Sequence, residues 1–260
     1  MTRIMSWNVN GIRACAEKGF LTWLEAESPD ILCLQETKAH PEQLKKELLA
    51  PSDGKGGAYF VQWASAKRRG YSGVAILSKR EPRSVQGLGL DEFDDEGRVL
   101  AADFGDFVLV SAYFPNSQDA GARLDYKLRF CDAILALCDR LVAEKRHVVV
   151  AGDYNIAHRP IDLANPKQNE GNPGYLPEER AWMDKYTGSG YVDTLRHFNG
   201  EPGQYTWWTY RVPGARDRNI GWRLDYHCVD AGLSPALKTA SIHPGVLGSD
   251  HCPVSIDLDL

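Results

Sequence analysis

The stretch HVVVAGDYN, residues 147–155, contains an apolar run that ends in Asp153 and Asn155. VVVAG has no polar residue on either face, so it predicts a central strand that is covered on both sides. In open α/β folds, ligands bind beyond the carboxyl ends of such strands. The stretch therefore predicts a buried sheet and a polar site at the end of this strand.

Similar short apolar runs, most of them rich in β-branched residues, predict further strands. They span residues 3–9, 31–36, 73–78, 98–104, 107–114, 226–231 and 252–260. Helices are predicted at 17–27, 41–49, 122–144 and 177–187. A mixed chain with many strands and few helices indicates two packed sheets flanked by helices.

Composition places the chain among globular proteins, because 43% of its 260 residues are apolar and 25% are charged. We expect one domain over residues 1–260 and a monomer. The first residues contain no signal-peptide apolar core and no membrane span, which predicts a cytoplasmic protein without membrane contact. The formal charge of −5 argues against a nonspecific polyanion binder, so any DNA surface must be local.

Six cysteines are spread along the chain without a CxxC pair, and several lie inside apolar runs. This pattern is typical of packing in a reduced core rather than of zinc ligands or disulfides. We therefore expect six buried free thiols.

Polar side chains follow several predicted strands at the points where the strands end. Asn8 and Asn10 follow the first strand, Glu36 ends the second, and Tyr113 lies near the end of the strand at 107–114. Each residue alone could be a cap, a turn former or a solvated strand end. Their repetition indicates instead a polar cluster at one edge of the sheets.

The last two strands show the reverse arrangement. Asp225 precedes the strand at 226–231, and Asp250 and His251 precede the final strand. If both strands run antiparallel to the others, these residues reach the same edge. The expected cluster is then Asn8, Asn10, Glu36, Tyr113, Asp153, Asn155, Asp225, Asp250 and His251.

Carboxylate and amide oxygens without cysteine suit a hard cation, Mg²⁺ or alternatively Mn²⁺. Such a cation polarises a phosphoryl oxygen, while a carboxylate or a histidine prepares the attacking water. The cluster therefore predicts phosphodiester hydrolysis. Ser249 and Cys252, the neighbours of Asp250 and His251, are not expected to be nucleophiles, because no acyl-transfer framework accompanies them.

Six sequence blocks carry a resemblance to a known family. They are LQET (34–37), SAYFPN (111–116), GDYN (152–155), NPKQN (165–169), GWRLDY (221–226) and GSDHCP (248–253). The blocks resemble those of exonuclease III type apurinic/apyrimidinic (AP) endonucleases of the bacterial branch, within the endonuclease/exonuclease/phosphatase superfamily. The resemblance covers essentially the whole chain. It implies a four-layered α/β sandwich of two packed mixed β-sheets flanked by helices.

The resemblance also implies catalytic roles. Asp153 would orient or deprotonate the attacking water, and Asn155 would hold that water. Tyr113 would contact the scissile phosphate or assist the leaving oxygen. His251, oriented by Asp225, would stabilise the transition state. Whether Asp153 or His251 is the general base is left open.

The implied metal site centres on Glu36, with Asp250 as a candidate for a second position, and the number of metal ions is left open. The full candidate set is Asn8, Asn10, Glu36, Asp153, Asn155, Asp250 and His251. Asn10 stands where mammalian members of the family have Asp, so this site carries one negative charge fewer.

Substrate contacts are expected in the stretch 204–226, which interleaves aromatic and basic residues. Aromatic faces can hold an extrahelical sugar, and arginines can contact phosphates. The aromatic residues are Trp207, Trp208, Tyr210 and Trp222, and the basic ones are Arg211, Arg216, Arg218 and Arg223. Each aromatic residue could also simply be core. The resemblance assigns Trp207 and Trp222 to the pocket for the abasic deoxyribose and leaves Trp208 open.

Further DNA contacts are implied outside that stretch. Asn169 would bind a phosphate oxygen, and Asn172 and Gly174 would lie beside the target nucleotide. The loop KRRGYSG (67–73) would contact the DNA backbone through Lys67, Arg68, Arg69 and Tyr71, although such a loop could be only a solvated turn. Arg211 replaces an apolar residue of the family, and Asp119 falls where mammalian members place an intercalating Arg.

The sequence therefore predicts a Mg²⁺-dependent DNA-repair nuclease that cleaves duplex DNA 5′ to abasic sites. 3′-Phosphodiesterase and 3′→5′ exonuclease activities, and 3′-blocked DNA as a substrate, are also expected, in proportions that are left open. The alternatives are an enzyme that mainly processes 3′ ends, a phosphatase or phospholipase of the superfamily, and a noncatalytic DNA-damage-binding module.

Overall fold

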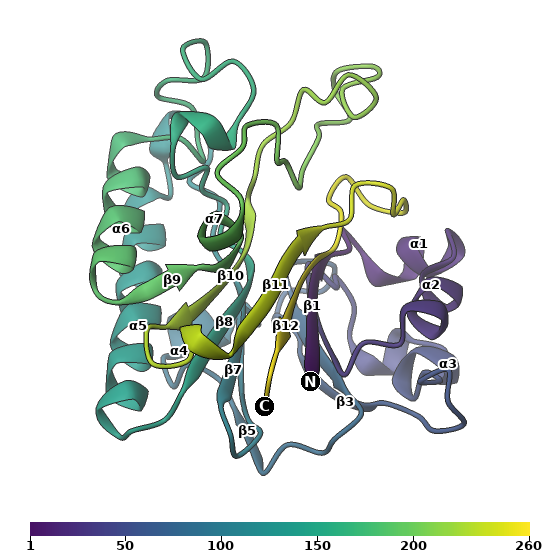
Figure 1. Cartoon of the computed structure of the whole chain (residues 1–260). Coiled ribbons are helices and arrows are strands. Elements are labelled where there is room, and N and C mark those ends of the chain that lie inside the picture. The colour runs from purple at the N-terminus through teal and green to yellow at the C-terminus, as the bar shows by residue number, and fades with distance from the viewer.

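The computed structural model describes all 260 residues, whose strands form two six-stranded sheets (Figure 1). The first sheet has the order β11-β12-β1-β2-β4-β3. Its strands are β1 (Thr2–Asn8), β2 (Ile31–Gln35), β3 (Phe60–Ala64), β4 (Val74–Ser78), β11 (Leu237–Ile242) and β12 (Val254–Leu258). The second sheet has the order β5-β6-β7-β8-β10-β9. Its strands are β5 (Ser84–Gln86), β6 (Val99–Asp103), β7 (Val108–Tyr113), β8 (Val148–Asp153), β9 (Tyr191–Asp193) and β10 (Asp225–Asp230).

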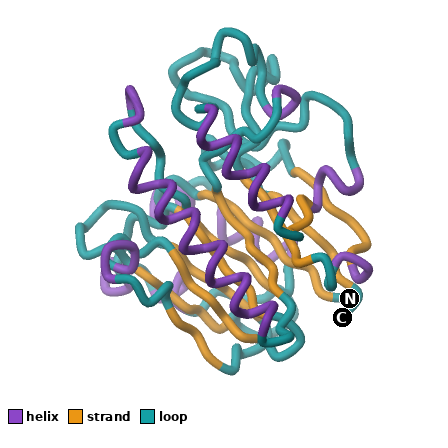
Figure 2. The backbone as a smooth tube through the Cα atoms, turned by 90° about the vertical axis from the view of Figure 1, so that its left-hand side faces the viewer, coloured by secondary structure: helices purple, strands orange, loops and turns teal.

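Helices cover the outer face of each sheet, as Figures 1 and 2 show from two sides. The first sheet carries α1 (Ile12–Glu17), α2 (Phe20–Glu27) and α3 (Lys46–Leu49). Next to the second sheet are α4 (Asp91–Asp94), α5 (Leu124–Ala143), α6 (Pro177–Gly188) and α7 (Thr194–Phe198). Short 3₁₀ segments lie at Pro41–Gln43, Asp119–Gly121, Pro160–Asp162 and Ser234–Ala236. None of the helices combines the length and the apolar character that a membrane crossing needs.

Three apolar cores hold the layers together. One fills the space between the two sheets, with Ile76 of β4 and Leu109 of β7 among its members. A second packs α5 and α6 on the second sheet, and a third packs α1 and α2 on the first. Three interfaces between four layers confirm the expected four-layered sandwich.

Strand direction brings the polar strand ends together. β7 and β8 run parallel, so Tyr113 pairs with Asp153 at their carboxyl ends. β10 runs antiparallel to β8, which places Asp225 at its own start opposite Asp153. β12 likewise runs antiparallel to β1. The condition on which the expected cluster depended, that the last two strands run against the others, is therefore met.

Two predicted helices differ from the structure. The helix expected at 17–27 is instead two helices, because Gly19 adopts φ 98° and turns the chain between α1 and α2. The helix expected at 41–49 is a 3₁₀ segment followed by the short α3, because Leu44 is extended. The predictions at 122–144 and 177–187 agree with α5 and α6 within two residues.

The thiols agree with the expectation. All six cysteines are free and buried. Burial raises the pKa of each, to about 12 for Cys33 on β2, so none is suited to act as a thiolate.

Candidate active site

The centre of the polar cluster is a group of three side chains from three different strand ends. One ligand atom each of Glu36, Asp153 and His251 lies within 4.8 Å of the other two. Asn8 joins two of them, since its Nδ2 donates to Glu36 Oε1 and to Asp153 Oδ2, both at 2.9 Å. The Oδ1 atom of Asn8 accepts from the backbone N–H of Asn10 at 3.0 Å. In this arrangement the Asn8 amide nitrogen orients the two carboxylates, and the Asn8 amide oxygen is bonded to the backbone of Asn10.

Left-handed backbone turns carry the residues that follow these strands. Asn10, Glu36 and Asn155 have φ values of 46°, 50° and 51°. Residues other than glycine take this conformation at a cost, and such residues concentrate at functional sites. The turns direct the side chains of Glu36 and Asn155 into one cleft.

Asn10 and Asp250 form the flank of the cluster. Asn10 Nδ2 donates to Asp250 Oδ1 at 2.9 Å, and Trp207 Nε1 donates to Asp250 Oδ2 at 3.1 Å. Burial disfavours the Asp250 charge, but His251 and these two bonds outweigh it and lower the pKa of Asp250. Asp250 is therefore a carboxylate that is already bonded through both oxygens.

Lys38 is a member of the cluster that the sequence reasoning missed. Its Nζ lies 2.7 Å from Glu36 Oε2 and 2.5 Å from Asn10 Oδ1. This ammonium also helps to lower the pKa of Glu36 against the effect of burial. Its position two residues after Glu36, directly beyond LQET, was the only signal available in the sequence.

His251 and Asp225 form a buried pair. His251 Nδ1 lies 2.8 Å from Asp225 Oδ2, and the other ring nitrogen, Nε2, lies 3.9 Å from Asp153 Oδ2. Burial works against the imidazolium, but Asp225 and Asp153 outweigh it and raise the pKa of His251 to about 10. The imidazole is thus fixed in orientation and presents a positive charge to the cleft.

The environment of Asp153 disfavours its charged form, whereas that of His251 favours its charged form. Burial raises its pKa above the usual carboxyl range, His251 opposes this, and the charges of Asp225 and Glu36 raise it further. Its Oδ1 accepts from the backbone N–H of Asn155 at 2.8 Å. A carboxylate with a raised pKa is a stronger proton acceptor than an exposed one, which suits a general base.

Tyr113 lies at the end of β7 above a buried arginine that was also missed. The guanidinium of Arg98 is 4.8 Å from the centre of the Tyr113 ring, and its Nη1 donates to the Tyr113 carbonyl at 3.1 Å. Burial and the charge of Glu36 raise the pKa of Tyr113 well above its usual value. Tyr113 is therefore a neutral hydrogen-bond donor.

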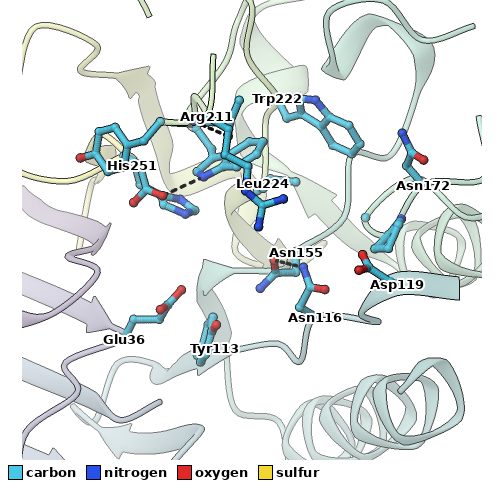
Figure 3. A pocket seen from close by; sticks show the side chains of 16 residues that line it. Glu36, Tyr113, Asn116, Asp119, Asn155, Asn172, Arg211, Trp222, Leu224 and His251 are labelled. Atoms are coloured by element: carbon cyan, nitrogen blue, oxygen red, sulfur yellow. Dashed lines mark hydrogen bonds between the residues drawn. The ribbon is translucent and has the colours of Figure 1, made fainter. Parts of the chain in front are cut away.

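A cleft of about 600 Å³ opens above the cluster (Figure 3). Eleven of the predicted site residues line it: Glu36, Tyr113, Asn155, Asn172, Gly174, Trp207, Tyr210, Arg211, Trp222, Asp250 and His251. Five more residues complete its walls: Asn116, Asp119, Pro173, Thr209 and Leu224. Asn8, Asn10, Asp153 and Asp225 are absent from this lining.

Trp207 and Trp222 stand perpendicular to each other in one wall, with ring centres 6.2 Å apart. Trp207 also pairs with the backbone of both Trp222 and His251, which connects this wall to the cluster. Trp208, which the sequence left open, is not part of the wall. It is 3% exposed and packs with Ala215 and Cys252.

The arginines of the stretch 204–226 do not all reach the cleft, contrary to expectation. Only Arg211 lines it. Arg216 donates to three backbone carbonyls, including that of Ser249, and Arg218 donates to two carbonyls of its own loop. Arg223 is 1% exposed and pairs with Asp162 and Asp193. Three of the four arginines therefore hold the loops that form the walls, because they donate to partners inside the protein.

The remaining predicted DNA contacts lie outside the cleft. Asn169 Nδ2 donates to the Ala164 and Asn165 carbonyls, and its Oδ1 accepts from Asn172 at 3.0 Å. Asn169 thus supports the loop that presents Asn172 to the cleft.

In the loop 67–73, Lys67 pairs with Asp95 and Arg69 pairs with Glu42. Arg68 lies over the Tyr71 ring at 5.5 Å. The Tyr71 hydroxyl accepts from Arg98 at 2.8 Å, so this loop is connected to the arginine beneath Tyr113.

Comparison with known proteins agrees with this geometry. Residues 5–251 match the Endonuclease/Exonuclease/phosphatase family. An exodeoxyribonuclease of Bacillus subtilis is 43% identical over 99% of this chain and 100% of its own length. A DNA-(apurinic or apyrimidinic site) endonuclease of Dictyostelium discoideum is 40% identical over 99% of this chain and 71% of its own.

Solved structures give the same result. An AP endonuclease from Archaeoglobus fulgidus superposes with a TM-score of 0.86 at 29% identity, covering 100% of both chains. A 3′ phosphatase from Neisseria, bound to a product DNA hairpin, superposes with a TM-score of 0.86 at 27% identity, again over 100% of both chains. The chain therefore belongs to the Endonuclease/Exonuclease/phosphatase family, and its resemblance to exonuclease III type AP endonucleases is confirmed.

Proposed function

We propose that this protein is a Mg²⁺-dependent nuclease that hydrolyses the phosphodiester bond 5′ to abasic sites in duplex DNA. The main observation behind the proposal is that a polar cluster and an aromatic wall lie side by side in one cleft. Glu36 and His251 line the cleft with Asp153 close beside them, and the perpendicular Trp207 and Trp222 form a wall. The names of the relatives, which include exodeoxyribonucleases and AP endonucleases, support the same reaction.

The donor set fits a hard divalent cation. Glu36 faces the cleft, and one of its oxygens lies within 4.8 Å of an oxygen of Asp153 and of a ring nitrogen of His251. Oxygen ligands without thiolate favour Mg²⁺, with Mn²⁺ as an alternative. When bound, the cation would polarise a phosphoryl oxygen and offset negative charge on the phosphate. Glu36 would hold it chiefly, and Asp153 and Asp250 are further candidates.

The side chains around this position have distinct proposed tasks. Asp153, with its raised pKa, accepts a proton from the attacking water, and Asn155 orients that water. His251, held charged by Asp225, stabilises negative charge on the phosphate. Tyr113 donates a hydrogen bond from its neutral hydroxyl. These assignments remain predictions, as do the monomeric state and the cytoplasmic location.

The walls favour a sugar that lacks its base. The Trp222 ring is close to Gly174, and Leu224 adds an apolar surface. A deoxyribose without a base presents an apolar face that such a pocket accommodates, whereas a complete nucleotide needs more room. Arg211 at the mouth supplies a cation for the DNA backbone.

A duplex that carries one tetrahydrofuran residue, labelled at its 5′ end, tests the proposal. With Mg²⁺ we expect one incision directly 5′ to the analogue, a 3′-hydroxyl product, and no cut in the matched undamaged duplex. Chelation should abolish cleavage and added Mg²⁺ should restore it. Release of 3′-blocking groups without incision would make 3′-end processing the main activity, and no reaction on either DNA would refute a nuclease function.

Substitution of Gly174 by Ala tests the shape of the pocket. Gly174 has φ +90°, and a Cβ would lie 3.2 Å from the Asn155 carbonyl and 3.3 Å from the Trp222 ring. We expect a loss of about 1–2 kcal/mol in the free energy of unfolding from the left-handed conformation. Incision of abasic DNA should fall about tenfold, because both neighbours must shift.

Gly171→Ala is the matched control. Gly171 has φ +80° with nothing within 4 Å of its Cβ position. It should lose similar stability in chemical denaturation but keep its incision rate. Equal activity losses in the two variants would contradict the pocket argument.

A further inference from the structure

A fully buried ion pair connects α5 to α6 behind the cleft. Lys127 Nζ lies 2.7 Å from Glu179 Oε1, and both side chains are 0% exposed. Removing two charges from water is costly, and a buried pair often adds nothing to stability compared with apolar residues of the same size. The other contacts of this pair point to a reason for its presence other than stability.

The Lys127 ammonium holds the residue that follows the catalytic strand. Its Nζ donates to the Asn155 carbonyl oxygen at 2.6 Å. The other polar groups of Asn155 are also bonded. Its N–H donates to Asp153 Oδ1, its Nδ2 donates to the Phe114 carbonyl at 3.0 Å, and its Oδ1 accepts from Asn116 at 3.3 Å. Lys127 therefore completes the set of bonds that keeps Asn155 in its left-handed conformation.

Glu179 connects the same point to two further segments. Its Oε1 accepts from Ser117 Oγ, and its Oε2 accepts from the backbone N–H of Leu176 at 2.9 Å. Ser117 follows Asn116, and Leu176 lies two residues after Gly174. Asn116, Asn155 and Gly174 all line the cleft, whereas Lys127 and Glu179 do not. One buried pair thus joins three segments of the cleft wall.

We propose that Lys127, with Glu179 as its counter-ion, is a positioning residue that acts on the reaction through Asn155. The inference rests on the proposed function, in which Asn155 orients the attacking water. A charge-assisted bond from an ammonium is stronger than one from a neutral donor, so it can hold a carbonyl in a strained turn. Glu179 neutralises the Lys127 charge and holds the ammonium within hydrogen-bond distance of the Asn155 carbonyl.

The variant Lys127→Met/Glu179→Gln tests the proposal. A single substitution would leave one buried charge without its partner and could prevent folding. The double variant removes both charges. The amide oxygen of the new glutamine side chain can accept from the Leu176 N–H, and its NH₂ group can donate to Ser117 Oγ once that hydroxyl turns. The bond to the Asn155 carbonyl is lost together with the ion pair. We expect kcat on abasic duplex to fall about tenfold with KM nearly unchanged, since the contacts to DNA remain.

The same pair of substitutions in an Asn155→Ala background identifies the route of the effect. If Lys127 acts through the Asn155 side chain, the double substitution should cost less than about twofold there, because residues that act as a unit are not additive. Leu141→Ala, a cavity at the far end of α5, is the control for general destabilisation. It should keep the wild-type kcat well below its melting temperature.

Several results would overturn the inference: wild-type kcat in the double variant, an equal loss in the Asn155→Ala background, or an equal loss in Leu141→Ala. A crystal structure of the double variant gives an answer that needs no substrate. We expect the Asn155 side chain to leave the Phe114 carbonyl, and an unmoved Asn155 would refute the positioning role even if abasic DNA proved not to be the substrate. Wild-type protein that fails to cut abasic duplex would refute the proposed function alone.

Discussion

Asp153→Asn is expected to lower kcat on abasic duplex by about 10²- to 10⁴-fold, the range that a general base contributes. Asp153 is 1% exposed and receives hydrogen bonds from Asn8 and Asn155. Asn removes the proton acceptor from this position. It also places an amide NH₂ where one carboxylate oxygen accepted, so one of those two donors loses its partner.

Stability should change much less than activity. Burial and the nearby charges of Glu36 and Asp225 disfavour the Asp153 carboxylate, whereas the charge of His251 favours it. A neutral Asn relieves the repulsion but loses this attraction and one acceptor, so we expect a melting temperature close to that of the wild type. Loss of function at nearly unchanged stability indicates a residue retained for catalysis.

Single-turnover incision and thermal unfolding measure the two effects separately. Asp106→Asn is the matched control, because Asp106 lies in an exposed ion pair with Arg80. This control should change neither activity nor stability measurably. An Asp153→Asn protein that cleaves at the wild-type rate would contradict the proposed role of Asp153.

Much of the polar cluster could be predicted from the sequence because each residue there follows or precedes an apolar run. The run at 147–155 became β8, and its Asp153 meets Asp225 and His251 in space. Strand pairing has a fixed geometry, so the position of a polar residue at a strand end is largely determined by the neighbouring strands. The direction of β10 and β12 was the one assumption that only the structure could test.

The buried polar residues behind the cleft could not be predicted in the same way. Lys127 belongs to an amphipathic helix, where a lysine ordinarily lies on the solvated face. Arg98 opens a predicted strand, a position typical of a surface residue. Lys127 is buried because Glu179, distant in sequence, neutralises it. Arg98 pairs with the nearby Glu96, but its guanidinium also donates to the Tyr71 hydroxyl and to the Tyr113 carbonyl, which only the fold brings to it. A pattern of apolar residues within one element contains no information about such a partner.

Short strands were missed for a related reason. β5 and β9 have only three residues each, and β3 is only partly buried, so none shows the continuous apolar run that predicts a strand. They form edges of the two sheets. Their pairing with a neighbouring strand, rather than their own composition, determines their structure.

His251→Ala should lower kcat by about 10²- to 10³-fold, the loss expected when one donor to a developing negative charge is removed. The imidazole is buried, and its Nε2 points to the cluster while Asp225 holds the Nδ1 atom. Asp225→Asn should cost about 10- to 100-fold, because it removes the group that orients the ring. The combined variant should be no slower than His251→Ala by more than about threefold, since Asp225 acts through His251.

The pH profile distinguishes loss of charge from loss of orientation. In the wild type, Asp225 helps to raise the pKa of His251 to about 10, so the imidazolium persists through neutral pH. In Asp225→Asn only Asp153 and Asp250 still oppose the effect of burial, so the pKa of His251 falls and the charge is lost at a lower pH. The alkaline limb of the kcat profile should therefore move to lower pH, and part of the activity should return on acidification.

Asp184→Asn is the control for this pair. Asp184 also bonds a buried histidine, since its Oδ1 lies 2.8 Å from His158 Nε2, but the Asp184 side chain is exposed and lies outside the cleft. Its pH profile should match that of the wild type. If Asp225→Asn keeps the wild-type profile, or if its effect adds in full to that of His251→Ala, then Asp225 does not act through the imidazole. In that case its unbonded Oδ1, which no side chain or backbone group satisfies, would have to carry its role.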